Sequence, residues 1–176
     1  MKPPYKALTL AIHPNSRGAS WIAFENPFSP YDWGTVGTRG REKNARVIAG
    51  LEKILLRLSI ETIVLEAFER GTSKRRSRVA KLGRAIVALA SSRSIDITVY
   101  TLGDVRSCFA SVGAVTRQDI ADATARMLPA ISHLVPKRRR PWEGEQWRMS
   151  LFAAAALTLT HYQLGASRVF DDLMGG

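Results

Sequence analysis

The sequence predicts an α/β protein built on a mixed five-stranded sheet with helices on its faces. Three short apolar segments separated by turn-forming residues open the chain, a pattern typical of an antiparallel meander. Segments of helical periodicity then alternate with two more apolar strands, as in βαβ units. The chain of 176 residues is long enough to bury a core, and we expect one domain over residues 1–176.

The first three strands are expected at residues 7–12, 21–24 and 32–36. Residues 13–18 (HPNSRG) lie between the first two and are rich in turn formers, so a turn is predicted there. Residues 27 and 30 are prolines that precede the third strand. The chain therefore begins as strand, turn, strand, loop, strand.

Residues 41–58 change to helical period, with an apolar stripe made of Val47, Ile48, Leu51, Leu55 and Leu58. Residues 60–65 form a compact apolar strand that ends at Glu66. A second helix follows, and its buried stripe consists of Val79, Leu82, Ile86 and Leu89. The fifth strand is expected at residues 95–100.

Three helices complete the chain. One lies near Val105, and another covers residues 116–127, where Thr116 and Asp119 have the spacing of a capping box. The closing helix is predicted over residues 145–164, with Gly165 as its C-cap.

The charge balance points to a polyanionic partner. Twenty-six Lys and Arg against fifteen Asp and Glu give a formal net charge of +11, and nucleic acid is the first candidate partner for so basic a domain. The alternatives are a basic surface that serves solubility alone and an assembly subunit that meets an acidic protein. The cations expected to contact nucleic acid include two clusters, around residues 74–84 and 137–140; the full set is Arg17, Lys74, Arg75, Arg76, Arg78, Lys81, Arg84, Arg117, Lys137, Arg138, Arg139 and Arg140.

Within the first cluster, Arg78, Lys81 and Arg84 lie off the apolar stripe of their helix, so we expect them to face solvent. Trp142 and Trp147 flank the second cluster. An exposed tryptophan there would stack on unpaired bases, but we expect both rings to pack in the core.

The single cysteine, Cys108, excludes an internal disulfide and a thiolate zinc site, and we expect it to be a buried apolar filler. The longest apolar run, residues 151–159, is shorter than the ~20 residues that span a bilayer. The first twelve residues lack the features of a signal peptide. These observations predict a cytoplasmic protein without a membrane partner.

Two polar residues follow central-looking strands, namely His13 and Glu66. Ligands gather at the carboxyl ends of strands in α/β sheets, so both are candidates for the functional site. A structural alternative for Glu66 is an ordinary contact with a neighbouring arginine.

Glu145 is the third candidate, because it heads the inward stripe of the closing helix: Met149, Phe152, Ala156 and Leu159. Glu143 is its rival for that role, and a charge that merely favours the helix dipole is the structural alternative. Carboxylates gathered at one rim suit Mg²⁺, and two such ions can promote phosphodiester cleavage. His13 is a poorer Mg²⁺ ligand than an aspartate.

Four segments together resemble the RuvC family of Holliday-junction resolvases, which have a ribonuclease H-like fold. They are LAIHPNSRG (10–18), IVLEAF (63–68), the span 99–119, and KRRRPW (137–142) with RMSLFAA (148–154). The resemblance covers roughly residues 7–162. It implies structure-selective DNA cleavage with Mg²⁺ or Mn²⁺, branched DNA as the partner and a homodimer; no small-molecule cofactor is expected.

The family's metal ligands are a first-strand Asp, a Glu after the fourth strand and acids on the final helix. Carried over by position, the Glu is present as Glu66, whereas the two aspartates are replaced by His13 and Ala153. Glu145 remains as a carboxylate on the final helix. Either the domain binds branched nucleic acid without cutting it, or Glu66, Glu145 and His13 form a rearranged metal site.

Overall fold

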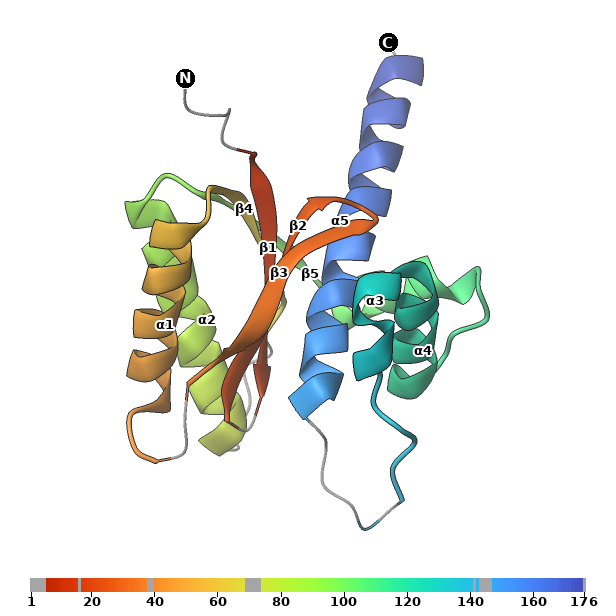
Figure 1. Cartoon of the computed structure of the whole chain (residues 1–176). Helices are drawn as coiled ribbons and strands as arrows, with labels where there is room; N and C mark the ends of the chain where they lie inside the picture. Colours follow the sequence, from red (N-terminus) through yellow and green to blue (C-terminus); the bar gives the residue numbers. More distant parts are fainter. Residues whose placement is uncertain are drawn as a thin grey trace.

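A five-stranded mixed sheet forms the centre of the protein (Figure 1). The computed structural model describes residues 6–15, 17–37, 40–68, 74–140, 142 and 147–175, and for residues 75 and 166–173 it describes the backbone alone. The strands are β1 (Leu8–Asn15), β2 (Gly18–Asn26), β3 (Ser29–Val36), β4 (Ile60–Glu66) and β5 (Asp96–Tyr100). Their order is β3-β2-β1-β4-β5; the first three pair antiparallel, and β4 and β5 continue the sheet parallel to β1.

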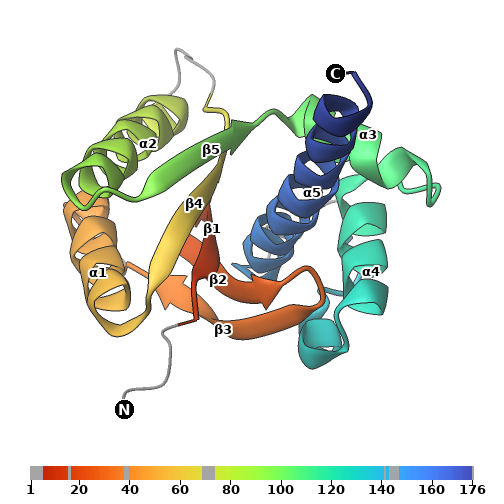
Figure 2. The same ribbon diagram turned by 90° about the horizontal axis from the view of Figure 1, so that it is seen from above.

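Helices cover both faces of this sheet (Figure 2). On one face lie α1 (Lys43–Arg57) and α2 (Lys74–Ser92), and on the other lie α3 (Leu102–Ala110), α4 (Arg117–Met127) and α5 (Trp147–Met174). A short 3-10 helix, Pro129–Leu134, follows α4 and was not predicted. The predicted fold class, a mixed sheet between two helical layers, is confirmed.

The core consists of two apolar clusters, one on each face of the sheet. Leu10 and Ile12 of β1 belong to the cluster under α1 and α2, whereas Ala11 belongs to the cluster under α5. This alternation follows from the two-residue period of a strand. On α5, Phe152 and Ala156 are buried as predicted.

The first hairpin differs from the prediction. Strand β1 runs through His13 and Pro14 to Asn15, so the turn is shorter than the predicted residues 13–18, with Arg17 as its described member. The strand continues because β2 pairs with β1 as far as Asn15, whereas the pairing of β1 with β4 ends at Ile12. A proline without an N–H is tolerated where one side of a strand is unpaired.

One predicted helix end is confirmed and another is wrong. The capping box of Thr116 and Asp119 is present at the start of α4, and Thr101 with Asp104 forms a second one at α3. Gly165 does not end α5, which continues to Met174. A glycine costs a helix only about 1 kcal/mol relative to alanine, which is too little to end it by itself.

Cys108 is a buried free thiol, as predicted, and burial raises its pKa. Within the described part of the chain, no helix combines the length and the apolar character needed to cross a bilayer.

Candidate nucleic-acid interface

The register of the sheet brings His13 and Glu66 together. The parallel pairing of β1 and β4 ends with Ile12 opposite Leu65, so the next residue on each strand meets its neighbour at the same rim. His13 Nε2 lies 3.2 Å from Glu66 Oε2, with the two side chains only 12% and 23% exposed. Both residues are at the carboxyl-end rim, as the sequence predicts.

The Glu66 carboxylate is held in its ionised form. Burial alone would raise its pKa, but the hydrogen bond and charge of His13, together with the charge of Arg117, lower it below the usual glutamate value. Glu66 is therefore an anion at neutral pH, paired with the imidazole beside it.

The other nitrogen of the His13 ring, Nδ1, is buried and has no hydrogen-bond partner among the described residues. The contact with Glu66 is consequently the polar interaction that orients this ring within the described structure.

Three clefts share Arg117 as a lining residue, and two of them are also lined by Glu66. The largest, about 610 Å³, contains His13, Glu66 and Arg76. A second, about 320 Å³, is lined by the cations of residues 137–139. The smallest, about 30 Å³, has Glu66 and Ala153 in its walls and is otherwise mostly apolar.

These walls do not make a magnesium site from the described residues. Mg²⁺ takes oxygen ligands in octahedral geometry, whereas the donors here are one carboxylate and one imidazole that already contact each other. Ala153 contributes a methyl group to the cleft of about 30 Å³ that Glu66 also lines. In the described ranges no three His, Cys, Asp or Glu side chains are grouped closely enough to hold a metal ion. Glu145, the predicted third ligand, and Glu143 lie outside the described residues.

A buried polar cluster, which was not predicted, lies at the end of β1 next to the rim. The Asn15 amide nitrogen donates to Ser20 Oγ at 3.1 Å and to Ser150 Oγ at 2.9 Å, and its side-chain oxygen accepts from the backbone N–H of Arg17 at 2.8 Å. The cluster fixes the end of β1 to β2 and to the first turn of α5. The signal available in the sequence was Ser150, a hydroxyl residue directly before the apolar run 151–159.

The prediction that Arg78 faces solvent is wrong. It is half-buried instead of facing solvent: its guanidinium donates to the backbone carbonyl of Asn15 at 3.0 Å and to the side-chain oxygen of Asn44 at 3.3 Å. Arg78 therefore connects α2 to α1 and to the end of β1. Arg75 has no described side chain.

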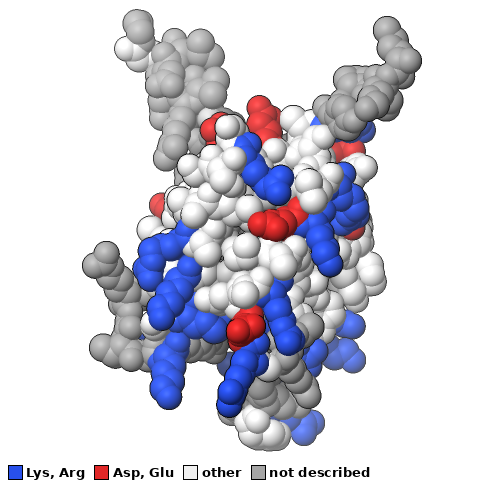
Figure 3. Space-filling model, turned by 90° about the vertical axis from the view of Figure 1, so that its left-hand side faces the viewer, with Lys and Arg blue, Asp and Glu red and all other residues white. Residues whose placement is uncertain are grey.

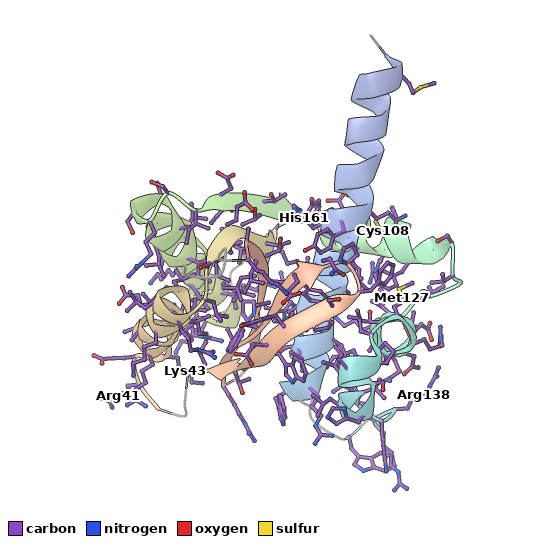
Figure 4. The ribbon with its side chains drawn as sticks, turned by 45° about the horizontal axis from the view of Figure 1, so that its top comes forward. Arg41, Lys43, Cys108, Met127, Arg138 and His161 are labelled. Atoms are coloured by element: carbon purple, nitrogen blue, oxygen red, sulfur yellow. The ribbon has the colours of Figure 1, made fainter. Side chains whose placement is uncertain are left out.

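The remaining predicted cations are exposed: Arg17, Lys74, Arg76, Lys81, Arg84, Arg117, Lys137, Arg138, Arg139 and Arg140. Figure 4 shows one of them, Arg138, below α4, on the side of the sheet opposite to Arg41 and Lys43, which are two further cations near the start of α1. Arg138 also forms an exposed ion pair with Asp119 at 3.4 Å.

Trp142 and Trp147 lie in different environments. Trp142 is 76% exposed, so the prediction that it packs in the core is wrong. The guanidinium of Arg140 lies over its ring at 5.6 Å. Trp147 is half-buried and has Arg148 over its ring. Trp142 lacks core contacts because it lies in a connection between elements, where local sequence says little about burial.

No protein-family model matches the sequence, and no curated protein matches it. Among solved structures, the chain is similar to Thermus thermophilus RuvC in complex with a Holliday-junction substrate, with a TM-score of 0.61, 17% identity and 96% of each chain covered. It is also similar to another structure of Thermus thermophilus RuvC, with a TM-score of 0.60, 19% identity and 96% of each chain covered.

The superposition extends over nearly the whole length of both proteins, as the four sequence segments predict. The chain therefore has a RuvC-like, ribonuclease H-like fold.

Proposed function

We propose that this protein binds branched DNA through the rim around Arg117 and does not cut it. The observation that carries the proposal is the composition of the rim. Cations line the clefts that meet at Arg117, while the described carboxylate among them, Glu66, is already engaged by His13. Such a surface attracts phosphates and is poorly suited to hold Mg²⁺.

The cations are arranged to contact separate strands. Arg117 lies between the cleft that contains Arg76 and the cleft lined by residues 137–139. A branched substrate offers backbones on both sides of a crossover, whereas a linear duplex offers one continuous surface. Contacts of this kind position the nucleic acid without reading its sequence. A related protein of the same fold has been solved with a Holliday-junction substrate, which supports this choice of partner.

Metal-dependent cleavage is the second candidate function. It is favoured by one observation, namely that Glu66 remains ionised at the carboxyl end of a central strand. In that case Glu66, Glu145 and His13 would be the residues that hold Mg²⁺ or Mn²⁺. We also infer a homodimer in either case, because a four-way junction presents two equivalent halves to a symmetric protein.

The deciding experiment uses a labelled four-way junction and a linear duplex of the same sequence. Binding and cleavage are measured in the same samples, with Mg²⁺, with Mn²⁺ and with a chelator. The variants are Glu66→Gln, Arg117→Ala and, as a control at the other end of α4, Arg126→Ala. Light scattering of the free and bound protein gives the oligomeric state.

We expect selective junction binding that is unaffected by the chelator, no nicks with either metal, and no loss of binding in Glu66→Gln. Arg117→Ala should lower the slope of log affinity against log salt by about 0.9, the value for one phosphate contact, and Arg126→Ala should not. Paired nicks that disappear in Glu66→Gln would instead establish the cleaving alternative. Equal binding of junction and duplex would refute structure selectivity.

A further inference from the structure

An exposed tryptophan, Trp142, distinguishes one basic part of the surface from the others. Lys and Arg side chains are also spread over the face of α1 and α2 (Figure 3), so positive charge by itself does not single out a binding surface. Trp142 is 76% exposed, and the guanidinium of Arg140 lies over its ring at 5.6 Å. An aromatic ring beside cations adds a second kind of contact to the electrostatic one.

The four cations that precede this ring, residues 137–140, are called the basic segment below, and the segment is attached to the start of α4. The backbone carbonyl of the buried residue before it, Pro136, accepts from the side-chain amide of Gln118 at 2.8 Å. Two residues later, Arg138 is paired with Asp119 at 3.4 Å. These contacts hold the segment beside α4 although it has no regular secondary structure.

The basic segment forms one wall of the cleft of about 320 Å³. Its lining includes the cations Arg117, Lys137, Arg138 and Arg139, and no Asp or Glu among the described residues lines it. Lys137 is exposed and forms no ion pair within the described part of the chain. A cleft with this charge attracts phosphate groups.

Trp142 is near enough to this cleft for one nucleic-acid strand to contact both. The tryptophan follows Arg139 by three residues, and an extended chain advances at most about 3.6 Å per residue. The two Cα atoms are therefore within about 11 Å of each other, which is roughly the length of three nucleotides at 3.4 Å each. A short stretch of one strand can thus contact the cleft through its phosphates and the ring through a base.

The ring favours unpaired nucleotides over a duplex. Inside a duplex the faces of the bases are stacked on each other and are closed to a side chain. Unpaired nucleotides expose both faces, and a base that stacks on an aromatic ring adds affinity without regard to its sequence.

The surroundings of the ring suit a nucleic acid better than a protein. The core of a protein interface is depleted of charged residues, whereas four cations in succession lie close to this ring in the sequence. A strand of nucleic acid supplies phosphates for these cations and an aromatic face for the ring at the same time.

We propose that Trp142 and the cleft lined by residues 137–139 bind an unpaired DNA strand next to the branch point, with one base stacked on the tryptophan. This inference rests on the proposed function, since it names the substrate class that the same surface prefers, namely branched DNA with a single-stranded arm. It adds Trp142 to the interface and predicts that bases contribute to affinity in addition to phosphates.

The test uses three four-way junctions in which one arm is fully paired, single-stranded, or single-stranded and abasic. The abasic arm keeps the phosphates and lacks the bases, so it separates stacking from charge. The variants are Trp142→Ala and Trp142→Phe. The control is Phe28→Ala, which removes another exposed ring from the turn between β2 and β3, at the end of the sheet away from the rim. Circular dichroism verifies that all proteins are folded alike.

We expect the wild type to bind the single-stranded arm about tenfold more tightly when it carries bases, the effect of one stacked base. Trp142→Ala should lose this preference and keep its affinity for the fully paired junction, whereas Trp142→Phe should retain most of the preference. Phe28→Ala should match the wild type on all three junctions. The base-bearing arm should also quench tryptophan fluorescence more in the wild type than in Trp142→Phe.

Equal wild-type affinity for the base-bearing and abasic arms would overturn the inference, and so would a preference that persists in Trp142→Ala. In both cases, selective binding of the fully paired junction would leave the proposed function intact. A wild-type protein that binds none of the three junctions would overturn the proposed function, and this inference with it, in favour of an acidic protein as the partner of these cations.

Discussion

Replacing His13 and Ala153 by aspartate is expected to convert the cleft beside Glu66 into a divalent-cation site. Residue 13 already lies within hydrogen-bonding distance of Glu66, and residue 153 lines a cleft with it. The double variant therefore brings three carboxylates to one place, and oxygen donors are the ligands that Mg²⁺ prefers.

The size of the effect follows from the charges. Without metal, two carboxylates about 4 Å apart repel by roughly 4 kcal/mol at an effective dielectric constant of 20, so the variant should be less stable than the wild type. An ion present at 100 times its Kd returns about 2.7 kcal/mol. For a chain of this length 1 kcal/mol changes Tm by about 2–4 °C, so the ion should raise Tm by about 5–11 °C.

Differential scanning fluorimetry with Mg²⁺, Mn²⁺ and chelator measures this shift directly. The matched control is His13→Asp with Ala153→Asn, which has the same shape but one carboxylate fewer, and its Tm should respond much less. A folded double-aspartate variant that ignores both ions would refute the reasoning. So would a wild-type protein that is stabilised by Mg²⁺ as strongly as the variant.

Three further outcomes follow from contacts at the rim. Asn15→Ala removes two buried hydrogen bonds and one part-buried hydrogen bond of about 1 kcal/mol each, and thermal melting should show a loss of about 2–3 kcal/mol. Because the pKa of Glu66 is lowered in the folded protein, its ionised carboxylate stabilises the fold at pH values above the ordinary glutamate pKa. This contribution is lost as the pH falls through the lowered pKa. In His13→Ala the main cause of the lowered pKa is gone, so the loss of stability on acidification should be smaller in urea titrations, and an unchanged acid limb would refute the role of the pair. Gly83→Ala forces a methyl group against the Phe68 ring and should cost about 1–3 kcal/mol; a double-mutant cycle with Phe68→Ala should show coupling of similar size, and independent effects would contradict the packing.

The order of strands and helices could be predicted because it depends on local periodicity. Leu82 and Ile86 on α2, and Phe152 and Ala156 on α5, repeat with the helical period and are buried where that period places them. The capping box of Thr116 and its partner is likewise complete within four residues of sequence.

Other features depended on contacts between distant residues and on the solvent exposure of single side chains. The first strand extends past its apolar core because β2 pairs with it as far as Asn15, so His13 lies inside a strand and not in a turn. Trp142 and Arg78 occupy environments opposite to those expected, since burial of a single side chain depends on what the rest of the chain packs around it.

The sequence by itself determined the fold class, the basic character of the protein and the presence of His13 and Ala153 where the resemblance implies aspartates. Only the tertiary structure decided that the His13 imidazole contacts the Glu66 carboxylate, and that Ser150 reaches Asn15 across 135 residues of chain. The physical reason is that composition and periodicity are properties of short segments. A distance between side chains on different elements is fixed by sheet register and helix packing.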